Sequence, residues 1–372
     1  MTEVLVGALA NGGRCVAHLD GKTVFVRGAI PGETVQIKIT DENAKVAFAD
    51  VVEVVEQSEL RVEPPCKHAK ECGGCDFQHV AFADQTKLLT QVLHDTYRRI
   101  GNVELTAQVQ SMGEPFGWRT RMSFAVDDQN RVCMHGARSH NLVPIEECLI
   151  AHNELPPVWR NLVSVEERAF AAVSSTGQST TDPMMVLTEK VLDRSFEHIA
   201  SGFWQVHPQA AETLVNTVQQ FGQPKAGERV VDLYSGAGLF TAFLAKSVGS
   251  AGSVLAIEQS AEASLFAREN LSDLSNVEIL CAPVEAIEFG DADLIVLDPP
   301  RAGAKKAIPA ILESRPSRIV YVSCDLATGA RDLRQLLAAG YRLADFAAFA
   351  LFPMTAHIET VALLVNPQTY KD

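Results

Sequence analysis

Short runs of apolar, mostly β-branched residues recur through the C-terminal half of the chain, and polar residues stand at the end of each run. These runs predict buried strands over residues 229–234, 253–257, 293–298, 318–323 and 359–365. The stretch 239–247 between the first two runs has a helical pattern. Strands that alternate with helices in this way predict an α/β fold with a largely parallel, doubly wound sheet that starts near Gly202.

The part of the chain before this sheet has a different organisation. A helical pattern covers roughly residues 77–100, and the pair Pro64-Pro65 marks a break ahead of it. The length of 372 residues predicts two or three domains, at roughly 100–200 residues each. With 47% hydrophobic and 21% charged residues, the composition excludes a disordered chain, a collagen and a small disulfide scaffold.

The N-terminus Met1-Thr2-Glu3 has neither a basic segment nor an apolar segment behind it, and no apolar run approaches the roughly 18 residues of a membrane helix. We therefore expect a soluble, cytoplasmic protein with free thiols and no membrane partner.

Charge argues at first against a nucleic-acid partner. The chain has 32 Lys+Arg against 46 Asp+Glu, a net charge of −14, whereas nucleic-acid binders usually present a basic field. Any contact with a polyanion must then come from a confined patch, unless these side chains only form a solvated face. The candidates for the patch are Arg119, Arg121, Arg138, Arg301, Lys305 and Lys306.

Three of the eight cysteines lie close together, as Cys66, Cys72 and Cys75, with two glycines between the last pair. Clustered thiols in a reducing compartment predict a metal or cluster site, and its fourth ligand would be Cys148 or Cys133. Zinc and iron–sulfur clusters both take four thiolates. The long first gap and the distant fourth cysteine favour iron–sulfur over zinc without excluding zinc.

Acidic residues at the predicted strand ends indicate a cofactor site. Asp232 lies in a strand that leads into the glycine turn 235–238, and Glu258 ends the next strand, where it could hold ribose hydroxyls. The G-x-G-x-x-G of dinucleotide sites is absent, and Asp298 ends a further strand. This pattern favours S-adenosylmethionine, and hence a methyltransferase, over other doubly wound enzymes.

Cys324 follows another predicted strand, and Glu359 begins the last one. Taken singly, each has an ordinary explanation, since such a cysteine is usually packed and such a carboxylate is often part of an ion pair. Together they have a specific use, because C5 of uracil or cytosine becomes nucleophilic only after a thiolate adds at C6. The pair therefore predicts a thiolate nucleophile and a carboxylate base beside the methyl donor.

With these motifs the chain resembles the RNA uracil-5-methyltransferases of the TRAM-containing, iron–sulfur type that modify 23S ribosomal RNA. The resemblance runs nearly end to end: it covers 29–35 in the N-terminal part, the three clustered cysteines, 202–207, 323–325 and 357–360. It implies three domains: an OB-like TRAM β-barrel at 1–57, an α+β central domain with the cluster at 58–201, and a Rossmann-like methyltransferase domain at 202–372. The helical segment at 77–100 is expected to pack on the catalytic domain.

The resemblance also assigns residue roles. It implies Cys66, Cys72, Cys75 and Cys148 as ligands of a [4Fe–4S] cluster, with Cys133 left as a core residue. Gln205, Tyr234, Glu258 and Asp298 would contact S-adenosylmethionine, Cys324 would be the nucleophile and Glu359 the base. The sequence departs from the family at His207, where asparagine is usual.

The expected activity is formation of 5-methyluridine in RNA, most directly 23S rRNA, with no obligatory protein partner. The choice of uracil over cytosine rests on the resemblance alone. The alternatives are a tRNA uracil-5-methyltransferase, a non-catalytic RNA-binding iron–sulfur protein, and a methyltransferase acting on a small molecule or protein.

Overall fold

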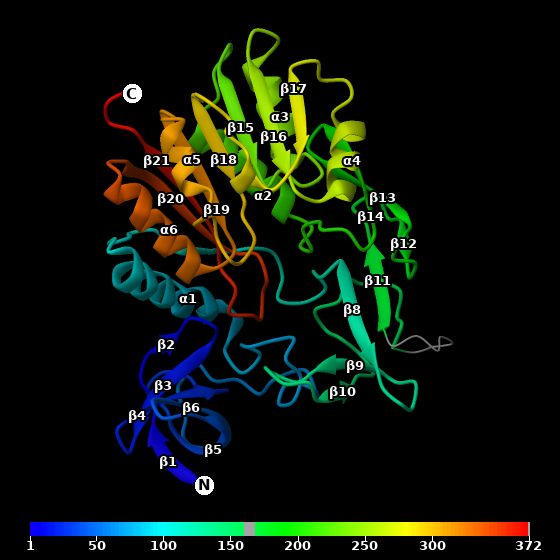
Figure 1. Cartoon of the computed structure of the whole chain (residues 1–372). Helices are drawn as coiled ribbons and strands as arrows, with labels where there is room; N and C mark the ends of the chain where they lie inside the picture. The colour runs from blue at the N-terminus through cyan, green and yellow to red at the C-terminus, as the bar shows by residue number, and fades with distance from the viewer. Residues whose placement is uncertain (160–167, 371–372) are drawn as a thin grey trace.

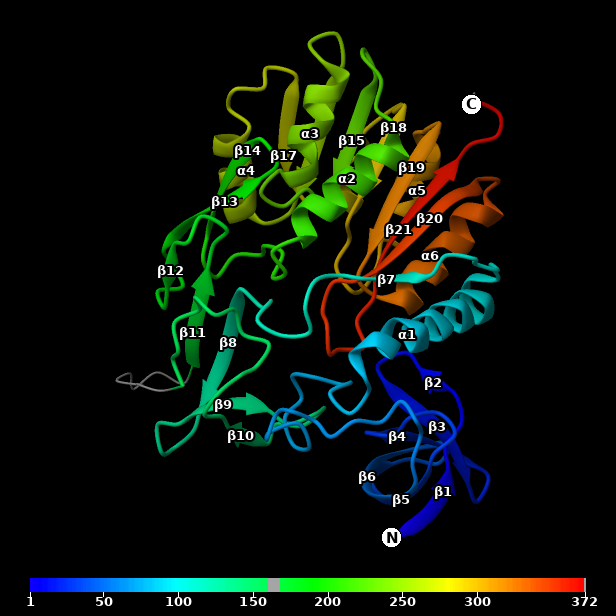
Figure 2. The same ribbon diagram turned by 180° about the vertical axis from the view of Figure 1, so that it is seen from behind.

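The computed structural model describes residues 1–159 and 168–370, and its strands form three regions along the chain (Figures 1 and 2). A small N-terminal sheet lies at one end of the molecule, next to helix α1 (Phe82–Thr96), and a large C-terminal sheet forms the other end. The strands of the central region stand beside the N-terminal sheet and connect it to the large sheet.

The N-terminal region is a six-stranded sheet in the order β1-β5-β6-β4-β3-β2, curled so that β1 lies against β3. In its fourth strand Val24 and Val26 are buried while Phe25 faces the opposite side, as the two-residue period of a strand requires. The strands are β1 (Thr2–Leu5), β2 (Leu9–Ala10), β3 (Arg14–Leu19), β4 (Lys22–Arg27), β5 (Thr34–Glu42) and β6 (Val46–Glu56).

A buried ion pair joins this sheet to the segment that follows it. The Glu33 carboxylate is fully buried and accepts hydrogen bonds at 2.6 Å from both Nε and Nη2 of Arg61. Backbone N–H groups of Ile30 and Ser58 donate to the same carboxylate at 2.8 and 3.1 Å. Burial alone would raise the pKa of Glu33, but these hydrogen bonds outweigh it and hold the pKa below its ordinary value.

The central region contains a five-stranded antiparallel sheet in the order β10-β9-β8-β11-β12 and a separate hairpin. The strands of the sheet are β8 (Arg121–Val126), β9 (Val132–His135), β10 (Leu142–Pro144), β11 (Arg168–Val173) and β12 (Ser179–Thr180). The hairpin consists of β13 (Val186–Val191) and β14 (Arg194–Ile199).

Helix α1 leaves the central region and packs on the C-terminal one, against α6 (Leu326–Ala338). It continues into a π-helical turn, η1 (Tyr97–Gly101), whose buried Tyr97 hydroxyl lies 3.3 Å from Oγ1 of Thr360. The helix begins later than the pattern over 77–100 predicts, because Phe77 hydrogen-bonds to Met354 in another segment.

The C-terminal sheet has eight strands in the order β17-β16-β15-β18-β19-β21-β20-β7. Its neighbours pair in parallel except where β21 lies between β19 and β20, and β21 is antiparallel to both. The strands are β15 (Arg229–Leu233), β16 (Ser253–Glu258), β17 (Val277–Cys281), β18 (Leu294–Leu297), β19 (Arg318–Ser323), β20 (Arg342–Ala350), β21 (Glu359–Val365) and β7 (Val109–Ser111).

Helices cover both faces of this sheet. Helices α2 (Ala210–Gly222), α3 (Leu239–Val248) and α4 (Ala261–Asn270) share a core with one face, and α1, α5 (Ile308–Glu313) and α6 share a core with the other. Adjacent residues of one strand divide between the two cores: Val230 belongs to the first and Val231 to the second. A short 3₁₀ turn, η2 (Val284–Ala286), precedes β18.

All five predicted strands are present, while β7, β17 and β20 were not predicted. Strand β17 is at an edge with Glu278 and Cys281 exposed, so it lacks a continuous apolar run. Strand β20 is rich in alanine and contains an irregularity between Leu343 and Asp345. Within the ranges 1–159 and 168–370, no helix has both the length and the apolar character needed to cross a bilayer.

Candidate active site and cysteine cavity

The candidate active site lies at one edge of the C-terminal sheet. The parallel strands β15, β16, β18 and β19 end there: Glu258 is the last residue of β16, and Tyr234, Asp298 and Cys324 directly follow the other three. Strand β21 runs in the opposite direction, so its first residue, Glu359, lies at the same edge. The sheet topology thus gathers five of the predicted residues at one edge, where open α/β sheets bind ligands.

The turn that follows β15 lies at this edge of the sheet, and a buried acid of the same strand lies beneath it. Tyr234 and Gly238 have positive φ angles of 63° and 93°, and a Cβ on Gly238 would lie 2.8 Å from Leu271. Beneath the turn, Asp232 is fully buried and accepts a 2.5 Å hydrogen bond from Thr241. Its other carboxylate oxygen has no partner among the described residues, and burial raises the pKa of Asp232 to about 7.

The Glu258 carboxylate accepts hydrogen bonds from two loops of the site. Its Oε2 accepts from the backbone N–H of Gly236 at 3.0 Å, and its Oε1 accepts from that of Ser260 at 2.7 Å. Each carboxylate oxygen keeps a second lone pair. The side chain is therefore fixed in place and still able to accept hydrogen bonds from the hydroxyls of a ribose.

Cys324 lies between the end of β19 and the N-terminus of α6, which Asp325 caps by accepting from Thr328 N–H at 2.8 Å. Burial, followed by the negative charges of Glu359 and Asp298, raises the pKa of Cys324 to about 12. Arg301 acts in the opposite direction. A pKa this high favours the thiol form of Cys324 at neutral pH, and a nearby cation or proton acceptor would favour the thiolate.

Glu359 is 4% exposed, and burial together with the nearby Asp298 raises its pKa. Burial also raises the pKa of Asp298, to about 7. Two neighbouring carboxyl groups that both resist ionisation retain a proton near neutrality. The pair thus places two carboxyl groups near the thiol, where a cation would favour their ionised forms.

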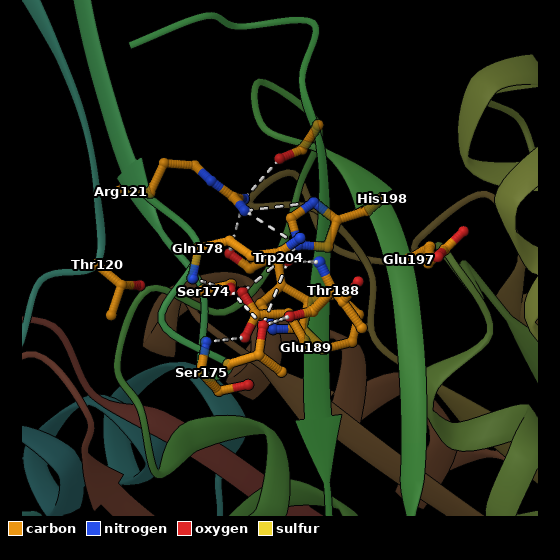
Figure 3. A network of polar contacts seen from close by, with 12 residues as sticks. Thr120, Arg121, Ser174, Ser175, Gln178, Thr188, Glu189, Glu197, His198 and Trp204 are labelled. Carbon is orange, nitrogen blue, oxygen red and sulfur yellow. Dashed lines mark hydrogen bonds and ion pairs between the residues drawn. The ribbon is translucent and has the colours of Figure 1, made fainter. Parts of the chain in front are cut away.

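The remaining predicted cofactor residue, Gln205, lies on a separate segment between β14 and α2, and a buried network holds the start of this segment in place (Figure 3). Nη1 of Arg121 donates to the carbonyl of Gly202 at 2.6 Å and lies 3.5 Å from that of Trp204. Nη2 of Arg121 is 3.4 Å from the His198 ring nitrogens, and His198 stacks on Trp204 at 5.1 Å.

Glu189 completes the network from β13. Its Oε1 lies 3.6 Å from Nε2 of His198, and its Oε2 accepts from Ser175 N–H at 2.8 Å. Burial lowers the pKa of Arg121 to about 10, and Glu189 opposes this change. Arg121 was predicted as a candidate contact to RNA. The structure instead commits its guanidinium to the backbone ahead of Gln205, so we assign Arg121 a positioning role, and its contact with RNA stays an untested prediction.

The thiols of Cys66, Cys72, Cys75 and Cys148 line one cavity in the central region. Backbone N–H groups surround them: Gly74 N–H donates to Cys72 Sγ at 3.3 Å, and those of Ile150 and Ala151 point at Cys148. Burial raises the pKa of Cys75 to about 12 and that of Cys148 to about 11, and the thiols raise one another's pKa further. The thiols are thus near neighbours.

Within the part of the chain that the structure describes, no three Cys, His, Asp or Glu side chains are close enough to hold one metal ion. Four thiols on one cavity are nevertheless a donor set that an iron–sulfur cluster can use, and N–H donors to sulfur suit such a cluster. Cys133 is fully buried, with its Sγ 3.4 Å from the Arg131 carbonyl, and does not line this cavity.

The sequence analysis did not predict a groove that is lined by both basic and acidic side chains. A groove of about 660 Å³ lies between the N-terminal sheet and the β9–β10 hairpin. Within it, Arg14 and Arg138 both stack over the Phe48 ring, at 5.4 and 5.5 Å, and Arg27 also lines it. Of the predicted patch, Arg138 lies in this groove, whereas Arg119 lies beside Cys75 and Cys148.

The strand order, the single antiparallel strand β21 and the acidic residues at the strand ends define an S-adenosylmethionine-dependent methyltransferase. Family profiles agree along the chain: residues 2–52 match the TRAM domain, 205–315 the methyltransferase small domain, and 284–366 the tRNA (uracil-5-)-methyltransferase family. The predicted N-terminal TRAM domain and C-terminal methyltransferase fold are confirmed.

Similar proteins share nearly the whole chain. An uncharacterised RNA methyltransferase of Streptomyces coelicolor is 36% identical over 97% of this chain and 92% of its own length. The 23S rRNA (uracil(1939)-C(5))-methyltransferase RlmD of Pectobacterium atrosepticum is 31% identical over 98% and 93%. The chain belongs to the TRAM-domain RNA uracil-5-methyltransferase family, and it is an RNA methyltransferase that binds S-adenosylmethionine.

A solved structure has the same fold. The tRNA (uracil-54, C5)-methyltransferase of Pyrococcus abyssi, in complex with S-adenosyl-L-homocysteine, superposes with a TM-score of 0.74 at 22% identity. The match covers 98% of this chain and 100% of that one, so the likeness includes all three regions.

Proposed function

We propose that this protein forms 5-methyluridine in 23S rRNA, with Cys324 as the nucleophile and Glu359 as the base. The observation that carries the mechanism is the pairing of β19 with β21, which sets Ser323 opposite Thr360 and so brings Cys324 and Glu359 to one point of the sheet edge. Support for the rRNA substrate comes from the relative in Pectobacterium atrosepticum, which is named for that activity.

The uracil must first leave its stack, because a base within a helix cannot be reached. The Cys324 sulfur then adds to C6, and its electron pair forms the C–S bond while the C5–C6 double bond becomes an enolate. C5 is now nucleophilic and takes the methyl group in line. S-adenosylmethionine would supply that methyl group from its sulfonium: the S–CH3 bond breaks, its electron pair stays on sulfur, and S-adenosylhomocysteine leaves as a neutral thioether.

Glu359 finishes the reaction by removing the C5 proton. The electron pair of that C–H bond rebuilds the C5–C6 double bond and expels the Cys324 sulfur, which leaves 5-methyluracil and a thiolate. Because the thiol and the two nearby carboxyls resist ionisation when the site is empty, a sulfonium next to Asp298 would lower the pKa of all three groups. The methyl donor would then help to form its own nucleophile.

We further propose that Tyr234, Glu258, Asp298 and Gln205 hold S-adenosylmethionine. Glu258 is already oriented by the N–H groups of Gly236 and Ser260, and Arg121 orients the segment that bears Gln205. Cys66, Cys72, Cys75 and Cys148 would hold a [4Fe–4S] cluster, for which the shared cavity and the N–H donors are the support. Methyl transfer needs no electron transfer, so the cluster would stabilise the central region.

The base assignment is tested with Glu359→Gln. This variant should still add Cys324 to uracil and transfer the methyl group, but it cannot remove the C5 proton. A covalent protein–RNA adduct carrying the methyl group should therefore accumulate on a denaturing gel, whereas Cys324→Ala should give neither adduct nor product. Absence of an adduct with Glu359→Gln would contradict the assignment.

The substrate is tested by incubating the protein and the methyl donor with unmodified 23S rRNA and with unmodified tRNA, followed by nucleoside analysis. We expect 5-methyluridine in the rRNA. A tRNA product would favour the second candidate, which the likeness of the fold to the Pyrococcus abyssi tRNA enzyme supports.

A further inference from the structure

The loop that precedes the proposed base, Glu359, is hydrogen-bonded to the segment that directly follows Cys75. This loop joins β20 to β21 and reaches down to the start of α1 in both views (Figures 1 and 2). The backbone N–H groups of Asp76 and Phe77 both donate to the Met354 carbonyl at 2.9 Å. In return, the Ala356 N–H donates to Oδ2 of Asp76 at 2.9 Å.

These contacts hold the loop in a conformation that it would not adopt alone. Met354 has a φ of 67°, in the left-handed region, which is unfavourable for a residue other than glycine. Gln85 of α1 adds a further restraint, because its Oε1 accepts from Met354 N–H at 3.3 Å. Met354 is buried with Trp118 and Ile150, next to Cys75 and Cys148.

The junction has little room to rearrange. Gly13, from the N-terminal sheet, packs so closely that a Cβ at this position would lie 2.9 Å from the Ala356 Cβ and 3.2 Å from the Asp76 Cβ. Asp76 directly follows Cys75, which lines the cysteine cavity. Through its carboxylate, Asp76 also hydrogen-bonds to Ala356 in the loop before Glu359.

We infer that Asp76 is a positioning residue for removal of the C5 proton. Its carboxylate accepts a hydrogen bond from Ala356 and thereby fixes the path of the backbone from Ala356 to Glu359. This inference rests on the proposed role of Glu359. Glu359 is the first residue of β21 and pairs with Phe349 of β20, so the sheet holds its backbone on one side and the loop before it sets the direction from which the chain enters. Without the Asp76 contact, the loop before Glu359 can move and displace the carboxylate. Misplacement of a base by about 1 Å can cost about 100-fold in rate.

The test is Asp76→Ala in the full-length protein, with Asp76→Asn beside it because the amide oxygen can still accept from Ala356. We expect Asp76→Ala to lower kcat by tenfold or more, to leave KM for RNA unchanged and to accumulate the methylated covalent adduct. Asp76→Asn should restore most of the rate. Glu71→Ala removes an exposed carboxylate of the same segment and should behave as wild type.

The adduct separates positioning from simple destabilisation, since a loosened fold would lower product and adduct together. Wild-type kcat in Asp76→Ala, or a loss of rate without adduct, would overturn the inference. If Asp76→Ala does not yield folded protein, Asp76→Ser, whose side chain is too short to reach Ala356, decides by the same outcomes.

A double variant links the effect to the base. In a Glu359→Gln background, Asp76→Ala should add nothing to the amount of adduct, because the step that it affects is already blocked. If Glu359→Gln itself gives no adduct, the proposed function fails; if it does and Asp76→Ala does not, only this inference fails.

Discussion

Thr360 lies directly opposite Ser323 in the antiparallel ladder between β19 and β21, and its hydroxyl donates to the Ser323 carbonyl at 3.3 Å. The residue after Ser323 is Cys324, and the residue before Thr360 is Glu359. One rung of the sheet therefore fixes the spacing of the proposed nucleophile and base. The following predictions test the environment of this pair and the parts of the fold that support it.

The first prediction concerns the reactivity of Cys324. Since burial, Glu359 and Asp298 raise its pKa to about 12, alkylation of the free protein by iodoacetamide should be slow at pH 7 and should keep rising through the alkaline range. Asp298→Asn removes one negative charge and should speed alkylation at a given pH by about tenfold for each pKa unit regained. Mass spectrometry of the Cys324 peptide measures the rate.

The exposed Cys281 provides the internal control, because its peptide should react equally in both proteins. An unchanged rate at Cys324 in Asp298→Asn would show that Asp298 does not act on the thiol.

The second prediction concerns the buried pair of Glu33 and Arg61. The pKa of Glu33 is lower in the folded protein than in the unfolded chain, so the pair stabilises the fold above the unfolded value of about 4.3. This contribution is lost as the pH falls through the folded pKa. Glu33→Gln should lower the free energy of unfolding at pH 7 by about 3 kcal/mol.

Urea denaturation at pH 7 and pH 3 measures the effect, and the difference between wild type and Glu33→Gln should shrink at the lower pH. Glu56→Gln, at an exposed carboxylate of the same sheet, should change the free energy of unfolding by less than about 0.5 kcal/mol. Equal stability of wild type and Glu33→Gln at pH 7 would refute a stabilising role.

The third prediction concerns the cysteine cavity. Anaerobically reconstituted protein should contain iron near a four-iron stoichiometry, and Cys66→Ser or Cys148→Ser should lose it. Cys133→Ala and Cys281→Ser, at cysteines outside the cavity, should keep it. Metal analysis that finds zinc without iron would show that the thiols bind zinc instead of an iron–sulfur cluster. Retention of iron in Cys148→Ser with loss in Cys133→Ala would mean that the fourth ligand is misassigned.

The fourth prediction concerns Arg121. Arg121→Ala leaves the carbonyls of Gly202 and Trp204 without their donor and should raise KM for S-adenosylmethionine by about tenfold, with RNA affinity unchanged. Arg121→Lys keeps the charge without the planar fork and should recover little. Arg131→Ala, which removes an exposed pair with Asp127, is the control. If Arg121→Ala instead lowers the RNA affinity and leaves the KM for S-adenosylmethionine unchanged, Arg121 contacts RNA.

The fifth prediction concerns the salt dependence of RNA binding. With a net charge of −14 and basic residues confined to a few places, the affinity should fall only shallowly with salt concentration. Arg138→Ala should reduce the slope of log K against log salt by about one. A steep slope in the wild-type protein would reveal a larger basic surface than the groove around Phe48.

Local sequence patterns predicted the parallel strands and the acidic residues at their ends. The apolar runs that end in acids and the glycine turn after Asp232 could be predicted because the residues that carry them are neighbours in the chain or repeat with a regular period. The roles of the clustered cysteines and of Cys324 with Glu359 stay predictions.

How these pieces meet depends on contacts between distant parts of the chain. Arg121 looked like a surface cation in the sequence, yet folding buries it against a distant segment and lowers its pKa. The contact of Asp76 with Ala356 joins residues far apart in the chain, and no local pattern encodes such a contact. Likewise, Glu359 reaches Cys324 only because β21 inserts antiparallel into the sheet.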